Sequence, residues 1–127
     1  MNQEFMLLIY NKVNEKENWP GEKHAAFLKA CENYISELKQ NNVLLAAQPL
    51  VRDGVCLSMQ EDGWLLAPVD KDAEIQVGYY HIVANNFDEA IAISKKNPEF
   101  EFVKDVHIEI RAVKTKEKDT GFVYPKN

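Results

Sequence analysis

The chain has 127 residues, the length of one typical domain, and its 46% hydrophobic and 28% charged residues are the composition of a globular protein, not of a disordered or fibrous one. The net charge of −5 at pH 7 argues against nucleic acid as a partner, because phosphate binding needs clustered lysine and arginine. We therefore expect one globular domain that binds no nucleic acid.

The first half of the chain predicts a strand, a helix and a second strand. Residues 5–10 form an uninterrupted apolar run, which is typical of a strand buried on both faces. A helix is expected to begin near Pro20, which suits a first helical turn, and to end at Asn41. Residues 43–51 then read as the second strand.

An extra hairpin is predicted in the middle of the chain. Asp53-Gly54 is a strong two-residue hairpin turn, so we expect it to join the strand before it to a new strand at residues 55–59. Asp62-Gly63 predicts a second tight turn. The sequence leaves open whether this hairpin covers a cleft or extends the sheet.

The second half predicts a strand over residues 78–84, a helix capped by Asn86, and a last strand over residues 106–113 with regular alternation. Strand, helix, strand, hairpin, strand, helix and strand is the order of an α+β protein of the ferredoxin-like, split βαβ type. We expect this domain to span residues 1–114, with a polar tail over residues 115–127.

The apolar strands predict a homodimer. The strands at residues 5–10 and 78–84 are apolar on both faces, whereas only two helices are available, and they can cover one face. The sheet of a second copy would cover the other face.

Four segments resemble the YCII-related (DGPF-type) family: "FMLLIY", "NNVLLAAQPL", "GYYHIVANNFDEAIAISKKNP" and "VHIEIRAV". Together they cover roughly residues 4 to 114. The resemblance implies a dimeric α+β barrel, in which two sheets face each other around a cleft. Most members have no assigned activity, whereas a few are dehydrochlorinase-like enzymes or carry a His-Asp pair suspected of acid-base work.

The chain departs from this family at the residues that would carry chemistry. The family's helix histidine falls on Cys31, and its aspartate before the helix-ending proline falls on Asn97. His24 lies about two turns earlier on the same helix, so it does not simply inherit the role. The DGPF tetrapeptide keeps only its proline, Pro68.

Five polar residues are candidates for a ligand site on the sheet. His107, Glu109 and Arg111 share one face of the last strand, where Arg111 could hold a carboxylate and His107 or Glu109 could move a proton. Tyr79 and His81 share a face of the preceding strand and could join them. The alternative is that Glu109 and Arg111 pair with neighbours across a dimer interface or face water, and that His81 is a packed, satisfied side chain.

The remaining motifs predict neither a metal nor a cofactor. His24, His81 and His107 lack the spacing of a metal site, and no phosphate-binding loop or nucleophile elbow is present. Cys31 and Cys56 are too far apart for a CxxC motif and too few for a disulfide framework, which predicts a cytoplasmic protein with small buried cysteines. The apolar runs are shorter than the ~18 residues of a membrane span.

Three functions follow, and the first two belong to different classes. The first is a homodimer that binds a small organic molecule in a cleft between two sheets, with little or no catalysis. The second is a dehydrochlorinase-like lyase or isomerase in which His24, His81 or His107 acts as the general base, and a regulatory accessory protein is a third reading. Whether any reaction is catalysed stays open, and the site residues carried forward are Tyr79, His81, His107, Glu109, Arg111 and His24.

Overall fold

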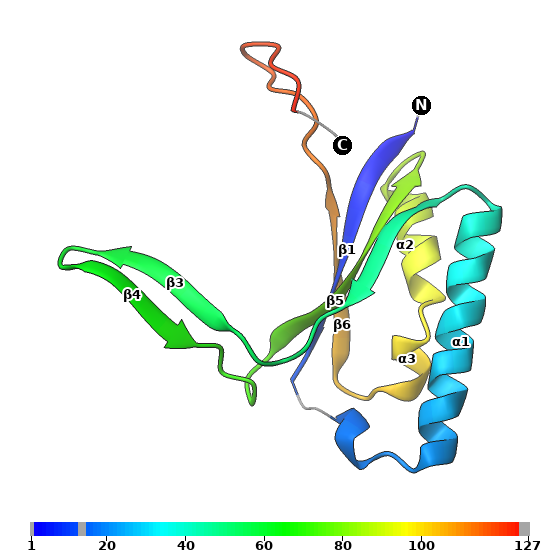
Figure 1. Cartoon of the computed structure of the whole chain (residues 1–127). Coiled ribbons are helices and arrows are strands. Elements are labelled where there is room, and N and C mark those ends of the chain that lie inside the picture. Colours follow the sequence, from blue (N-terminus) through cyan, green and yellow to red (C-terminus); the bar gives the residue numbers. More distant parts are fainter. Residues whose placement is uncertain (1, 13–14, 125–127) are drawn as a thin grey trace.

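The computed structural model describes residues 2–12 and 15–124 and shows an α+β protein with a four-stranded and a two-stranded antiparallel sheet (Figure 1). The elements in chain order are β1 (Gln3–Asn11), the 3₁₀ helix η1 (Glu15–Asn18), α1 (Gly21–Gln40), β2 (Leu44–Pro49), β3 (Val55–Gln60), β4 (Gly63–Pro68), β5 (Ile75–Ala84), α2 (Phe87–Lys95), α3 (Glu99–Phe102) and β6 (Val106–Ala112). The predicted mixed α+β class is confirmed.

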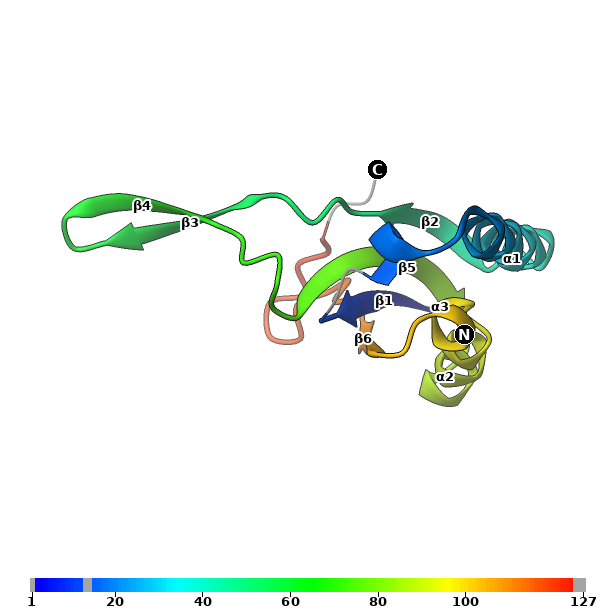
Figure 2. The same ribbon diagram turned by 90° about the horizontal axis from the view of Figure 1, so that it is seen from below.

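The four-stranded sheet has the order β2-β5-β1-β6, and each neighbouring pair is antiparallel. Strands β1 and β5 take the central positions, where both of their edges are paired. Helices α1, α2 and α3 all lie on one side of this sheet (Figures 1 and 2).

The core lies between the helices and the sheet. Phe5, Leu7 and Ile82 are fully buried at its centre, because every second residue of β1 and β5 points toward the helices. Tyr34 packs on this layer from α1, and its hydroxyl donates a hydrogen bond to the carbonyl oxygen of Ile93 at 2.8 Å. That bond ties α1 to α2 across the core.

No helix of the described residues covers the opposite face of the sheet. Met6, Leu8 and Tyr10 alternate with the buried residues of β1 and are only partly covered. Within one chain the strand is therefore buried on one face, and the second face, which we call the open face, is partly exposed.

The hairpin differs from its prediction. Asp53-Gly54 does not join two paired strands, because β2 pairs with β5, whereas β3 pairs with β4. The prediction at Asp62-Gly63 is confirmed: the turn lies between Gln60 and Gly63, and Gly63 has a φ of 120°, which favours glycine. The hairpin extends away from the helices, on the open side of the sheet (Figures 1 and 2).

The helix boundaries follow from local chemistry. The Asn86 side chain accepts a hydrogen bond from the backbone N–H of Glu89 at 2.9 Å, which confirms the predicted cap of α2. The helix ends at Lys95, before Asn97-Pro98, since proline disfavours helical geometry in the residue ahead of it. The short helix α3, which follows directly, was not predicted.

The described part of the expected tail, residues 115–124, forms a small turn closed by a β-bridge between Lys116 and Val123. The backbone N–H of Tyr124 donates to the carbonyl oxygen of Thr115 at 3.0 Å. The last three residues of the predicted tail lie outside the described residues. Among the helices that the structure describes, none is long and apolar enough to cross a bilayer.

Candidate functional site: a cavity beneath the first helix

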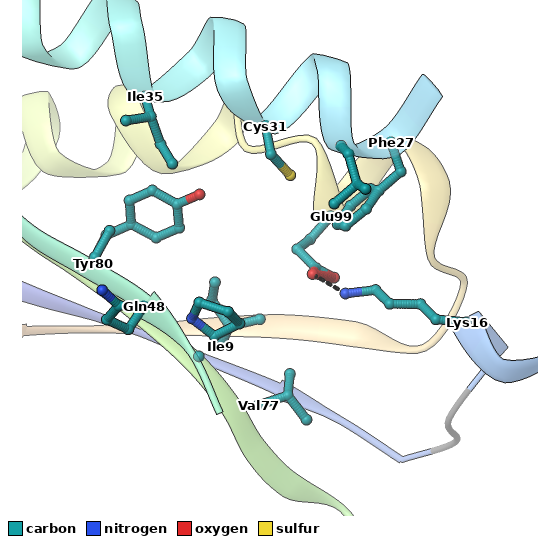
Figure 3. Close-up of a pocket in the computed structure, with 13 residues that line it drawn as sticks. Ile9, Lys16, Phe27, Cys31, Ile35, Gln48, Val77, Tyr80 and Glu99 are labelled. Atoms are coloured by element: carbon teal, nitrogen blue, oxygen red, sulfur yellow. Dashed lines mark hydrogen bonds and ion pairs between the residues drawn. The ribbon is translucent and has the colours of Figure 1, made fainter. Parts of the chain in front are cut away.

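A cavity of about 180 Å³ lies between α1 and the helix-covered face of the sheet, near β2 (Figure 3). We call it the α1 cavity. Its walls come from β1, η1, α1, β2, β5 and α3, so the fold of the whole domain assembles it. The lining residues are Ile9, Lys16, Phe27, Leu28, Cys31, Ile35, Ala47, Gln48, Pro49, Val77, Gly78, Tyr80 and Glu99.

The floor of the α1 cavity depends on a glycine. Gly78 lies opposite Pro49 in the register of β5 and β2. A Cβ atom at Gly78 would lie 3.2 Å from the carbonyl oxygen of Gln48 and 3.8 Å from Cδ1 of Ile9. A side chain here would press on the backbone of β2, so glycine keeps this wall of the cavity in place.

An aromatic cluster fixes the α1 side of the cavity. The Phe27 residue is 6% exposed, and its ring meets Trp19 and Phe102 edge to face, with ring centroids 5.3 Å and 5.5 Å away. The ammonium group of Lys16 lies 4.3 Å from the centroid of the same ring, within the range of a cation–π contact. This packing holds both Phe27 and Lys16 at one end of the cavity.

That end of the cavity carries an ion pair. Lys16 Nζ lies 2.6 Å from Glu99 Oε1, and the Glu99 residue is only 7% exposed. The second carboxylate oxygen of Glu99, Oε2, is buried and has no hydrogen-bond partner among the described residues. A buried carboxylate oxygen without a donor is costly, because it has lost water and gained nothing in return.

The position of Glu99 follows from the helix stop before it. Asn97 is buried, and its side-chain oxygen accepts a hydrogen bond from the backbone N–H of Glu99 at 2.9 Å. Pro98 then begins the turn of α3, which directs the Glu99 side chain back toward α1 (Figure 3). The Nδ2 atom of Asn97 is, like Glu99 Oε2, buried without a partner in the described part of the chain.

A thiol and a hydroxyl line the middle of the cavity. In Figure 3 the Cys31 sulfur and the Tyr80 hydroxyl both point into the space between α1 and the sheet. Burial, with a smaller effect of Glu99, raises the pKa of Cys31 to about 11. Burial likewise raises the pKa of Tyr80 well above its ordinary value. Both groups are therefore protonated and uncharged at neutral pH, which does not suit Cys31 to act as a nucleophile.

These features define what the α1 cavity can do. Its wall is mainly apolar, its few polar groups are neutral or paired, and one carboxylate oxygen lacks a donor. Such a lining favours a small apolar molecule that carries a hydrogen-bonding group. Among the described residues no group of three or more histidine, cysteine, aspartate or glutamate side chains could hold a metal ion.

The predicted sheet site lies elsewhere. His81 and Arg111 occupy the open face, on either side of Met6 in the register of β5, β1 and β6. The His81 ring nitrogen Nε2 lies 2.8 Å from a carboxylate oxygen of Glu4 on the neighbouring strand. A cross-strand contact of this kind gives His81 a structural partner.

Tyr79 and Glu109 form the next row of the open face, on either side of Leu8. Glu109 lies 3.9 Å from Arg111, two residues along the same strand, and both side chains are well exposed. An exposed pair at this distance contributes little to stability.

His107 lies further along the open face, opposite Tyr10. Its ring stacks on Tyr10 with centroids 5.0 Å apart and lies 3.4 Å from Glu74. His81 and His107 are four positions apart along β1 and on opposite sides of it, or about 13 Å along the strand and about 10 Å across it. The fold therefore brings the five predicted residues to one face, but it does not gather the two histidines into one cluster.

His24 is separate from the open face. It is an exposed residue in the first turns of α1, and its ring lies 6.3 Å from that of Trp19. In the described part of the chain none of the three histidines lines the α1 cavity.

No protein-family model matches the chain, and a comparison with curated proteins finds no significant relative. Sequence reasoning missed Lys16 and Glu99, because 83 positions separate them and neither belongs to a recognisable motif. The one available signal was the "NPEF" segment, where the helix stop also positions Glu99.

Proposed function

We propose that this chain binds a small, largely apolar molecule with one hydroxyl or amide group in the α1 cavity. The observation that carries this proposal is the Glu99 carboxylate, which ends an apolar cavity and has one oxygen without a donor. A ligand with an N–H or O–H group would supply that donor when the carboxylate turns toward the cavity, because Oε2 itself is shielded from solvent.

The charges around Glu99 favour a neutral polar group on the ligand. Lys16 already neutralises Glu99 at 2.6 Å, so a charged ligand would be left without a counterion. Lys16 has further N–H donors beyond the one directed at Glu99. A hydroxyl or a primary amide can donate to the carboxylate and accept from the ammonium group at the same time.

The volume limits the ligand to about the size of a benzene ring with one small substituent. A buried apolar cavity of about 150 Å³ is known to bind benzene, and the α1 cavity has about 180 Å³. Its aromatic and aliphatic walls, Phe27, Ile35 and Val77 among them, suit a flat ring.

We locate the ligand here and not in the inter-sheet cleft predicted from the sequence, because the polar groups of the open face already contact one another or are well exposed. The lyase or isomerase alternative requires a histidine beside the substrate. Since no histidine of the described residues lines the α1 cavity, binding without histidine catalysis is the better supported function.

We also propose that the chain is a ferredoxin-like subunit of a homodimer, related to the dimeric α+β barrels of YCII-related proteins. The strand order β2-β5-β1-β6 with helices on one side supports the subunit fold. The open face, with Met6, Leu8 and Tyr10 only partly covered, supports its packing on a second sheet.

Phenol and toluene make a suitable pair of probes, because they have nearly the same shape and differ in a hydroxyl. We expect phenol to bind wild-type protein at least about tenfold more tightly than toluene, since a hydrogen bond to a charged group contributes about 1.5–3 kcal/mol. Ligand-observed NMR titration measures both dissociation constants. Equal affinities would contradict a polar anchor in the cavity.

The variant Glu99→Gln tests the anchor directly. It keeps the shape of the side chain but removes the charge, so phenol should lose about tenfold in affinity while toluene is unchanged. Glu101→Gln is the matched control, because Glu101 is an exposed residue of the same short helix. A loss of phenol affinity of the same size in both variants would overturn the assignment.

A further inference from the structure

The hairpin formed by β3 and β4, residues 55–68, presents one strongly apolar face to solvent, and we call it the arm. The register pairs Leu57 with Leu66 and Met59 with Trp64, so these side chains share one face of the hairpin. They are between 60% and 69% exposed. The full apolar face consists of Val55, Leu57, Met59, Trp64, Leu66 and Pro68.

The arm is not an independent structure in water. Apart from Gly63, all residues of both strands are exposed, and neither strand carries a charged side chain. A two-stranded hairpin alone is at best marginally stable, and a contiguous exposed apolar surface of this extent marks a docking surface. The arm therefore requires a surface on which its apolar face can pack.

The base of the arm is fixed to the domain. Arg52 donates hydrogen bonds to the carbonyl oxygens of Lys71 and Ala73, at 2.6 Å and 3.2 Å, and so joins the two chain segments that enter and leave the arm. The same guanidinium group donates to the side-chain oxygen of Asn11, which is 5% exposed at the end of β1. These bonds set the direction of the arm relative to the sheet.

That direction points to a second copy of this chain. Figures 1 and 2 both show the arm on the side of the sheet opposite the helices, which is the side of the open face. We infer that two copies exchange arms, so that the apolar face of each arm packs on the body of the other subunit. This inference rests on the proposed homodimer, in which the open faces of two sheets meet.

The length of the arm and the usual spacing of stacked sheets agree with an exchange of arms. Stacked sheets lie about 10 Å apart, whereas a six-residue strand is about 20 Å long. An arm that leaves its sheet on the open side would cross the gap and run along the flank of the second subunit. One two-fold contact would then cover the open face and the apolar face of the arm in each chain.

The apolar area of the arm is also sufficient for a stable interface between two copies. Six large side chains at roughly 100 Å² of apolar surface each amount to about 600 Å² on one arm. Two exchanged arms and the surfaces beneath them would remove about 2,400 Å² from water, and a stable interface of standard size buries about 1,600 Å². A second copy of this chain is thus a partner large enough to account for the arm.

The test uses sedimentation velocity on the full chain at micromolar concentration, with two matched double variants. Leu57→Glu with Leu66→Glu places two charges on the apolar face, and Ser58→Glu with Leu65→Glu places two charges on the other face at the adjacent cross-strand pair. Both variants put like charges opposite each other, so any loss of hairpin stability is shared between them.

We expect the wild type and the Ser58/Leu65 variant to be dimers and the Leu57/Leu66 variant to dissociate at least about a hundredfold more readily, because its charges would be buried without partners. Far-ultraviolet circular dichroism should show intact helices α1 and α2 in all three proteins, since these helices are remote from the arm. Two results would overturn the inference while leaving the homodimer in place: dimers of equal strength in all three proteins, or equal dissociation of both variants.

A monomeric wild type would overturn both the arm exchange and the homodimer. The phenol titration described above is independent of these outcomes, because the α1 cavity is lined by residues of one chain. Failure of the arm exchange and failure of small-molecule binding are therefore distinguishable.

Discussion

Two buried tyrosines provide the sharpest test of the interior. Tyr34 and Tyr80 are 6% and 8% exposed, and their rings meet edge to face with centroids 5.4 Å apart. Their hydroxyls differ: that of Tyr34 donates to the carbonyl oxygen of Ile93 at 2.8 Å, whereas that of Tyr80 points into the α1 cavity. Replacing each tyrosine with phenylalanine removes one oxygen atom from nearly the same environment.

The expected losses of stability follow from the hydrogen bond that Tyr34 makes and that Tyr80, within the described part of the chain, does not. A neutral hydrogen bond within a protein contributes about 1 kcal/mol, so Tyr34→Phe should lower the free energy of unfolding by about that amount. For 127 residues the entropy of unfolding is about 0.27 kcal/mol per kelvin, which converts the loss into a decrease in Tm of about 4 °C. Tyr80→Phe should change the Tm by less than about 1 °C, because its hydroxyl has no hydrogen-bond partner among the described residues.

Differential scanning calorimetry at one protein concentration measures both changes, and urea denaturation gives the free energies independently. If Tyr80→Phe lowers the Tm as much as Tyr34→Phe does, the Tyr80 hydroxyl has a partner inside the protein. The cavity would then not have the open polar position that we assign to it.

Three further predictions concern the core, the cysteines and a helix cap. Leu7→Ala should lower the free energy of unfolding by about 2–5 kcal/mol, as urea denaturation measures, because Leu7 is fully buried. Leu8→Ala, on the open face, should lower it less and chiefly weaken the dimer, as sedimentation velocity measures. Because the pKa of Cys31 is raised to about 11, iodoacetamide at pH 8 should alkylate exposed Cys56 first, and the alkylation rate at Cys31 should keep rising toward pH 11. Mass spectrometry measures both rates, and equal rates at pH 8 would be inconsistent with a buried thiol at Cys31. Asn86→Ala should lower the free energy of unfolding by about 1 kcal/mol in the same urea assay, since the cap of α2 is lost, and an unchanged value would show that the cap contributes nothing.

The regular elements could be predicted because their signals are local. The alternation in β6 and the cap at Asn86 each depend on residues that are a few positions apart in the chain, and both were predicted correctly. The hairpin turn at Asp53-Gly54 was wrong for the same reason: the local turn signal is real, but β2 finds a better partner in β5, about thirty residues further along. Pairing between distant strands is a tertiary choice that turn residues do not encode.

The candidate site was less accessible to sequence reasoning. The open face could be predicted in part, since strand alternation alone places Tyr79 with His81 and His107 with Glu109. The α1 cavity could not, because its polar end joins Lys16 in a 3₁₀ helix to Glu99 after a proline turn. Only the packing of six elements brings these two residues together.

The most direct test of the central claim is a crystal structure of the protein with phenol. The account predicts one phenol in the α1 cavity, its ring against Phe27 and Ile35 and its hydroxyl oxygen about 2.5–3.0 Å from a carboxylate oxygen of Glu99. Phenol bound at the open face beside His81, or a cavity in which a water molecule bridges Asn97 and Glu99 while phenol is excluded, would contradict it.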